Sequence, residues 1–199
     1  AFATGTHTFL ETFIDDDRPI TYGILKPGTA YPGGVPVVKV RDYPDGEIKT
    51  EDLLTTDPAI DLEYRRSRLR AGDLLISIRG TIGRTAVVPP ELDAANITQD
   101  SARLSIRSNI DPRFVRAVLE SSIVRRQIRR MTTGLAVQGL NIGELRKLKV
   151  PVVPPATQRS IGDVVEAARS NQQATKERRR DTGSLKRTLL SAALTGSRP

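Results

Sequence analysis

The proline pair Pro154-Pro155 is the feature that most limits how this chain can fold, because the residue pattern changes there. Beyond it, apolar residues recur in the three- and four-residue steps of a helix. They gather at the two ends of this stretch, whereas residues 171–181 are polar and charged. Such a helix cannot bury a core by itself and needs a partner. We therefore predict a folded region at 1–154 and a helical spacer and dimerisation region at 155–199, interrupted at Gly183.

Residues 1–154 show two successive patterns. Up to Ile106, short apolar runs lie between glycine- and proline-rich turns, as in the strands of a sheet. From Pro112, apolar residues recur at helical spacing, with arginines such as Arg116 on the opposite face. The predicted strands are 35–41, 72–79, 84–88, 97–106 and 149–153, and the predicted helices are 112–131 and 142–148, the second capped by Asn141. The fold class is therefore α+β, a twisted β-rich domain with packed helices, followed by a long C-terminal helix for antiparallel coiled-coil pairing.

Length and residue types exclude several classes of function. A chain of 199 residues suits one ordinary domain with an appendage. It has no cysteine and a single histidine, His7, which excludes disulfides, zinc sites built from cysteine and histidine, and Cys–His nucleophiles. No catalytic or metal-binding residues are predicted. Because the sequence has no spanning apolar run and no secretory signal, we expect a cytoplasmic protein without membrane contact.

Basic residues are concentrated in the second part of the chain. The whole chain has 31 Lys and Arg against 23 Asp and Glu, a net charge of +8. Residues 1–60 hold five basic and ten acidic side chains, whereas residues 61–199 hold 26 and 13. A basic surface of this size suits a polyanion, although charge alone is equally compatible with a merely soluble, arginine-rich surface. Aromatic residues make up only 4%, few for base stacking, so double-stranded DNA is the favoured partner and RNA the alternative.

One short motif suggests a nuclease. Asp45, Glu47 and Lys49 follow Pro44 in the order of a PD…E-x-K site. In nucleases of that kind the residues come from separate strands, so that the carboxylates converge on a metal ion. Here a single turn holds all of them, and we interpret the match as chance. A stand-alone metal-dependent DNA endonuclease is kept as the alternative function.

Several motifs, in their order and spacing, resemble the specificity (S) subunits of type I restriction–modification systems. The most specific are Gly72-Asp73-Leu74-Leu75-Ile76-Ser77 and Gln138-Gly139-Leu140-Asn141-Ile142, followed by Pro154-Pro155 and Gln158-Arg159. Further matching segments are 20–28, 35–40, 78–83, 96–100, 134–145, 150–155 and 189–196. The resemblance covers nearly the whole chain, and it implies one target recognition domain at 1–154 with the helix that follows it.

The resemblance implies a DNA-recognition subunit that has no catalytic activity and binds no cofactor. S subunits typically carry two target recognition domains, each reading one half of a split DNA site, separated by antiparallel helices that set the spacer. They bind two methyltransferase (modification) subunits, which use S-adenosylmethionine to methylate adenine, and motor–nuclease (restriction) subunits join that core. This chain has one such domain and one such helix. The second recognition half is therefore either another copy of the chain or part of the same polypeptide.

Two sets of residues are predicted to make the contacts. Basic and polar residues at strand ends and turns are predicted to bind DNA: Lys26, Lys39, Arg41, Arg65, Arg66, Arg68, Arg79, Thr81, Thr98 and Gln99. Arg79, Thr81 and Gln99 are chosen for base edges, since Arg reads guanine and Gln reads adenine through paired hydrogen bonds. Apolar residues at the two ends of the terminal helix are predicted to pair with a partner helix: Ile161, Val165, Ala168, Leu185 and Leu189.

Overall fold

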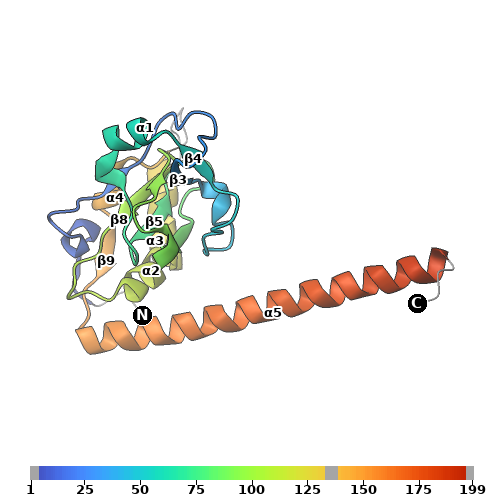
Figure 1. Cartoon of the computed structure of the whole chain (residues 1–199). Coiled ribbons are helices and arrows are strands. Elements are labelled where there is room, and N and C mark those ends of the chain that lie inside the picture. The colour runs from blue at the N-terminus through green and yellow to red at the C-terminus, as the bar shows by residue number, and fades with distance from the viewer. Residues whose placement is uncertain (1–4, 133–138, 196–199) are drawn as a thin grey trace.

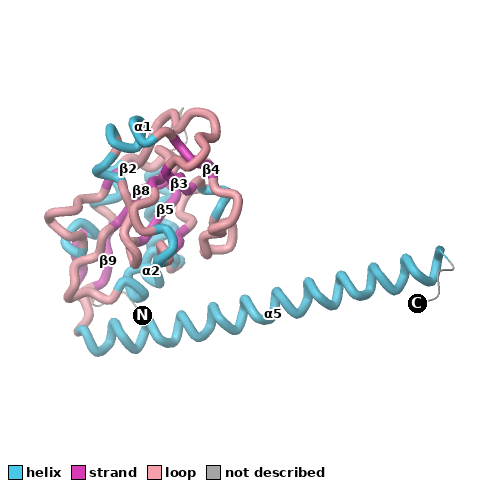
Figure 2. The backbone as a smooth tube through the Cα atoms, viewed as in Figure 1, coloured by secondary structure: helices cyan, strands magenta, loops and turns pink. Residues whose placement is uncertain are grey.

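The chain folds into a rounded body and one long helix that extends away from it, as the computed structural model shows (Figure 1). The structure describes residues 5–132 and 139–195. The body comprises the described residues up to 154, and the helix, α5, runs over Pro155–Thr195. Loops and turns connect most of the short strands in the body (Figure 2). None of the helices in the described ranges is both long and apolar enough to cross a bilayer.

Short strands in the described part of the body form three sheets. The strands are β1 His7–Phe9, β2 Thr21–Tyr22, β3 Val35–Val38, β4 Leu54–Thr56, β5 Leu74–Ser77, β6 Thr85–Val87, β7 Asn96–Ile97, β8 Ser101–Leu104 and β9 Lys149–Pro151. The central sheet has the order β2-β8-β5-β6 and is antiparallel throughout. A second sheet, β4-β3-β7, is antiparallel at β3–β4 and parallel at β3–β7. The pairing of β1 with β9 joins the two ends of the body.

Helices and 3₁₀ helices complete the described part of the body. They are α1 Pro58–Glu63, α2 Pro112–Glu120, α3 Ser122–Thr132, α4 Ile142–Arg146, η1 Leu10–Phe13, η2 Val40–Asp42, η3 Arg65–Ser67 and η4 Pro90–Leu92. Asp111 caps the start of α2, since its side chain accepts a hydrogen bond from the Arg113 N–H at 2.8 Å. Asn141, the predicted cap, precedes α4, and its side chain accepts a hydrogen bond from the Glu144 N–H at 2.8 Å.

The central sheet is covered on both faces, which explains why all four residues of β5 are buried. On one face, Leu74 and Ile76 pack in the larger core with residues of α2, α3 and α4. On the other face, Leu75 packs with Tyr43 and Ile97 in a smaller core that includes residues of the second sheet. Because alternate residues of a strand point to opposite faces, one strand supplies both cores.

The strands predicted at 72–79 and 84–88 are observed as β5 and β6, which pair antiparallel in a hairpin. Gly80 and Gly83 in its turn have φ angles of +67° and +84°, which glycine adopts at least cost. Other predicted elements differ in extent. The strand predicted at 35–41 ends at Val38, because the chain turns there into η2. The strand predicted at 97–106 is two strands, because β7 pairs with β3 whereas β8 pairs with β5. The helix predicted at 112–131 breaks at Ser121, whose backbone is extended. Finally, α5 continues through Gly183, since one glycine costs a long helix only about 1 kcal/mol.

Candidate nucleic-acid interface

Most of the predicted DNA-contact residues lie at opposite ends of strands β5 and β8. These strands are antiparallel, so Ser77 lies beside Ser101 at one end and Leu74 beside Leu104 at the other. Five predicted residues lie at the Ser77–Ser101 end, which we call the Gln99 end: Lys39, Arg79, Thr81, Thr98 and Gln99. Arg65, Arg66 and Arg68 lie at the other end. Lys26 lies two residues beyond Ile24 in the following loop, and Arg41 lies beside residues 48–52.

Backbone hydrogen bonds bring separate segments together at the Gln99 end. They run from Gln99 N to Ile24 O at 2.9 Å, from Thr98 N to Val38 O at 3.2 Å and from Arg79 N to Asp100 O at 3.2 Å. Lys26 follows Ile24 by two positions, and Lys39 follows Val38 directly. Segments that are far apart in the sequence therefore contribute to one surface.

The side chains of Arg79 and Gln99 meet at this surface. Arg79 Nη1 donates a hydrogen bond to Gln99 Oε1, while Arg79 stays exposed and Gln99 half-buried. Because this partner is a neutral amide, the hydrogen bond does not neutralise the charge of Arg79. The other N–H groups of the guanidinium and the amide –NH₂ of Gln99 can still donate to base edges. Two of the three residues chosen for base edges, Arg79 and Gln99, thus form a pre-oriented pair.

Thr98 differs from its predicted place on the surface. It is only 6% exposed, and its Oγ1 has no hydrogen-bond partner among the described residues. The bridge between Thr98 and Ile24 places its backbone beside a buried segment, so its side chain is enclosed. Lys39 is half-buried, whereas Lys26, Arg41 and Thr81 are exposed as predicted.

A groove lined by seven arginines lies at the other end of β5 and β8, and we call it the arginine groove. Its arginines are Arg18, Arg65, Arg66, Arg68, Arg70, Arg103 and Arg146. The side chains of Arg65 and Arg66 are exposed. Arg68 is anchored instead, since its Nε donates to Oδ2 of the fully buried Asp61 at 2.7 Å.

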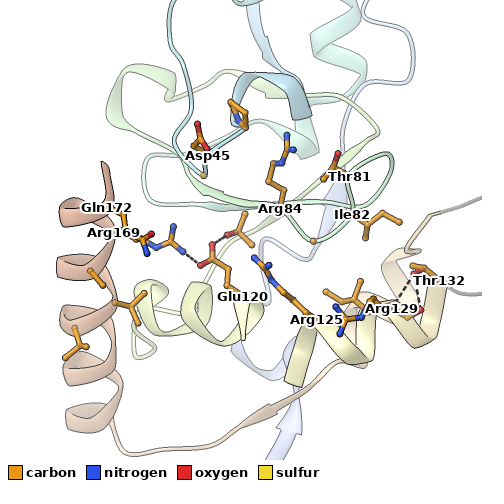
Figure 3. A pocket seen from close by; sticks show the side chains of 18 residues that line it. Asp45, Thr81, Ile82, Arg84, Glu120, Arg125, Arg129, Thr132, Arg169 and Gln172 are labelled. Carbon is orange, nitrogen blue, oxygen red and sulfur yellow. Dashed lines mark hydrogen bonds and ion pairs between the residues drawn. The ribbon is translucent and has the colours of Figure 1, made fainter. Parts of the chain in front are cut away.

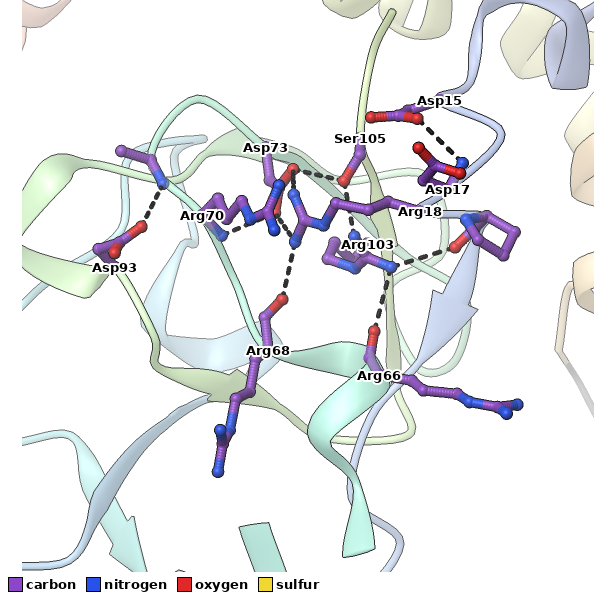
Figure 4. Close-up of polar contacts among 12 residues, drawn as sticks. Asp15, Asp17, Arg18, Arg66, Arg68, Arg70, Asp73, Asp93, Arg103 and Ser105 are labelled. Atoms are coloured by element: carbon purple, nitrogen blue, oxygen red, sulfur yellow. Dashed lines mark hydrogen bonds and ion pairs between the residues drawn. The ribbon is translucent and has the colours of Figure 1, made fainter. Parts of the chain in front are cut away.

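A buried polar network adjoins the arginine groove (Figure 4). Asp73 accepts hydrogen bonds from both Nη atoms of Arg18, at 2.9 and 3.0 Å, and from the Ser105 hydroxyl at 2.6 Å. Arg103 donates to the Ser105 hydroxyl at 2.6 Å and to two backbone carbonyls at 3.1 Å. Burial, and after it the charge of Arg18, lower the pKa of Arg103 to about 10. Arg103 therefore stays charged at neutral pH. Its alternation with Ala102 and Leu104 along the predicted strand indicates a polar face but cannot reveal this network.

A second groove lies between α5 and the body (Figure 3). Glu120, the last residue of α2, accepts a hydrogen bond from the Thr85 hydroxyl and forms an ion pair with Arg169 of α5. The prediction for Arg116 was wrong: the sequence pattern places it on an exposed face of the helix, but the residue is only 5% exposed. Its Nη2 donates to the Gly46 carbonyl at 2.6 Å, which draws it inward. Burial lowers the pKa of both Arg116 and Arg169.

The residues predicted for helix pairing have different surroundings. Ile161 packs against the larger core of the body, so in this structure its side chain faces its own domain. Val165 and Ala168 line the groove between α5 and the body. The side chains of Leu185 and Leu189 lie outside the part of the chain whose side chains are described. Val164 and Leu190, which the sequence did not single out, are 70% and 52% exposed on α5.

The nuclease-like motif does not form a metal site with other acidic residues. Asp45 lines the groove beside α5, whereas Glu47 is exposed in the same turn. Within residues 5–132 and 139–195, no cluster of three or more His, Cys, Asp or Glu side chains is arranged to hold a metal ion.

The type I restriction enzyme EcoBI specificity subunit of Escherichia coli is similar to this chain, with 32% identity over 162 residues. The chain is related to type I restriction specificity subunits. The resemblance that its motifs predict is thereby confirmed. The match covers 81% of this chain and 34% of that protein, so the chain spans about a third of the relative's length. No protein-family model matches the chain.

Solved structures from type I restriction–modification systems share the fold. One of them was solved in a study of complex assembly and conformational transition of the type I R-M system. Its TM-score with this chain is 0.64 at 20% sequence identity, and the match covers 94% of this chain and 44% of that one. The HsdS subunit from Thermoanaerobacter tengcongensis gives 0.62 at 19% identity, over 96% of this chain and 45% of that one. The S subunit from M. genitalium gives 0.54 at 14% identity, over 81% and 38%. The α+β fold class is confirmed, while coiled-coil pairing stays a prediction.

Proposed function

We propose that this chain reads one half of a bipartite DNA site for a type I restriction–modification complex. The observation that carries the proposal is the sequence similarity to a specificity subunit over 81% of the chain. The Gln99 end supports it, because an arginine and a glutamine side chain lie together on an accessible surface. These are the side chains suited to guanine and adenine edges in the major groove.

The same proposal includes partners that carry out the chemistry. The chain binds no cofactor and has no catalytic residue of its own. Methyltransferase subunits that use S-adenosylmethionine and motor–nuclease subunits assemble on it in the cytoplasm. A second recognition half, from another copy or from the same polypeptide, pairs with α5. The division into a recognition domain at 1–154 and a helical region at 155–199 is part of this proposal, since α5 leaves the body at Pro155.

Reconstitution with the methyltransferase subunits of the same system tests the proposal. We expect the assembled complex to select a bipartite duplex sequence from a random library, and the chain alone to bind DNA weakly. One recognition domain reads a short half-site, which offers limited specific energy over backbone attraction, whereas two linked domains gain by effective concentration. Nanomolar, sequence-specific binding by the isolated chain would contradict this expectation.

Two inexpensive assays address the alternatives. Plasmid cleavage by the purified chain with Mg²⁺, abolished by Asp45→Asn or Glu47→Gln, would support the endonuclease. Preference for single-stranded RNA over duplex DNA in competition would support an RNA-binding module. We expect neither result.

A further inference from the structure

The charges of the arginine groove are only partly compensated by acidic residues. Seven arginines and two aspartates, Asp17 and Asp93, line the groove. Buried Asp61 and Asp73 neutralise two of these arginines, since Asp61 pairs with Arg68 and Asp73 pairs with Arg18. The groove therefore keeps an excess of positive charge.

Arg103 is the most unusual member of this set. It is 2% exposed and hydrogen-bonds a hydroxyl and two carbonyls, but among the described residues it forms no ion pair with a carboxylate. Its Nε has no hydrogen-bond partner in the described part of the chain. Burying a charge without a counter-ion is costly, and proteins normally pair such a group. The Asp73 carboxylate reaches Arg103 only through the Ser105 hydroxyl and is already paired with Arg18, so the two arginines share one counter-charge. An anion that enters from the groove would add the missing negative charge.

Arg66 and Arg70 offer accessible donors above this buried cation. Both side chains are exposed and line the groove. The Arg66 carbonyl accepts a hydrogen bond from Arg103, and the Arg70 N–H donates to Asp73 at 2.8 Å. The backbone at both positions is thus fixed to the buried network, while the guanidinium groups remain available. Fixed, planar guanidinium groups match the geometry of phosphate oxygens.

We propose that the arginine groove is a phosphate-binding site. The phosphates come either from the DNA backbone, which rests on the proposed function, or from a free phosphate ligand. The groove lies at the opposite end of β5 and β8 from the Arg79–Gln99 pair. A contact here positions the domain without reading bases, because phosphates carry no sequence information.

The test compares the wild-type chain with Arg66→Gln combined with Arg70→Gln. Arg126→Gln with Arg130→Gln is the matched control, since both arginines are exposed on α3 beside a different pocket and the change in charge is the same. A second groove variant, Arg65→Gln with Arg146→Gln, keeps the test valid if the first variant does not fold. Circular dichroism establishes that each variant is folded.

The first measurement is thermal unfolding in sodium phosphate against sodium chloride at equal ionic strength. We expect phosphate to raise the midpoint for the wild type and the control but not for the groove variants. The second measurement is the salt dependence of binding to a duplex of mixed sequence. Each lost phosphate contact lowers the slope of log K against log salt by about 0.9, so the groove variant should lose about 1.8 and the control nothing.

The combination of results identifies the source of the phosphate. If the groove variants change the slope of log K against log salt for duplex binding, the groove binds the DNA backbone, whether or not phosphate raises the unfolding midpoint. A phosphate effect with an unchanged slope assigns it to a free phosphate ligand. The proposal is overturned if the groove variants match the control in both measurements. If the assembled complex selects no duplex sequence, the proposed function fails, and thermal unfolding alone then decides whether the groove binds phosphate.

Discussion

Arg169 of α5 forms an ion pair with Glu120 at the C-terminal end of α2. A second attachment lies nearer the start of α5, where Gln158 Oε1 accepts a hydrogen bond from Asp111 N at 3.0 Å and Arg113 Nη1 contacts Asp163 at 2.6 Å. Two attachments separated along one helix fix its direction, whereas one would leave it free to swing. The Glu120–Arg169 pair thus determines how the body is held on α5.

We expect Glu120→Gln to loosen α5 from the body without unfolding the body. The change removes the charge that lies between Arg116 and Arg169, leaving two like charges close together. The expected loss in unfolding free energy is about 1–3 kcal/mol. Spin labels on the body and on α5 should report a broader distance distribution. Glu63→Gln, an exposed acid on α1, is the control and should leave that distribution unchanged.

Arg79→Ala tests the base-reading pair in the assembled complex. We expect a loss of discrimination of about 1–3 kcal/mol at one base pair, because a bidentate contact is lost and Gln99 loses the donor that orients it. Selection from a random duplex library measures this loss. Arg126→Ala removes an equal charge elsewhere and should leave the selected sequence unchanged. Unaltered affinity and preference after Arg79→Ala would show that another residue reads the base.

Local features of the fold were predictable from the sequence because neighbouring residues determine them. The glycines around Thr81 specify the β5–β6 hairpin, and Asn141 specifies the start of α4. The predicted boundaries of helices and strands were wrong where tertiary contacts determine them. Gln99 lies in a turn because β7 and β8 join different sheets, and no local pattern reveals that choice.

The candidate site was predictable in residue type but not in arrangement. The sequence selects Arg79 and Gln99 separately, and only the fold shows that they share a hydrogen bond. Arg103 alternates with Ala102 and Leu104 along the strand, and this pattern predicts a side chain on a polar, solvent-facing side of the sheet. Its hydrogen-bond partner Ser105 is bound in turn by Asp73, which comes near both residues only when β5 and β8 pair.

Tyr43 makes the stability of the body sensitive to alkaline pH. Its hydroxyl hydrogen-bonds the Ser101 hydroxyl at 2.5 Å, and burial raises the pKa of Tyr43 to about 12 from 10. The unfolded state therefore loses this proton first, so the contribution is complete below pH 10 and declines as pH rises from 10 to 12. The stability of the wild type relative to Tyr43→Phe should fall by about 2–3 kcal/mol across that window in urea titrations. Tyr22→Phe, an exposed ring, controls for general alkaline effects, and a constant difference for Tyr43→Phe would contradict the prediction.

Val164 and Leu190 are the exposed apolar residues that we select to test helix pairing. Ile161→Asp is a poor test, because Ile161 packs in the core of its own body. Val164→Asp with Leu190→Asp instead changes side chains that are 70% and 52% exposed on α5. We expect the double variant to keep the unfolding midpoint of the body and to lose assembly with the second recognition half, since two charges would be buried in an apolar seam. Light scattering of the reconstituted complex measures assembly, and Ser170→Asp with Ser184→Asp is the control for added charge on α5.

Shortening α5 tests whether the helix sets the spacer between half-sites. Its 41 residues at about 1.5 Å each span about 61 Å, which is nearly two turns of B-DNA at about 34 Å. Deleting 173–176 removes about one helical turn beyond Gln172, which lies in the groove between α5 and the body, so the attachments at Gln158 and Arg169 are kept. We expect the assembled complex to select half-sites with a shorter spacer, because the second recognition half moves about 6 Å along the helix. A library of duplexes with spacers of different length measures the preference. Substituting the same four residues by alanine preserves the helix length and should preserve the spacer. If the shortened chain selects the original spacer, α5 does not act as the ruler.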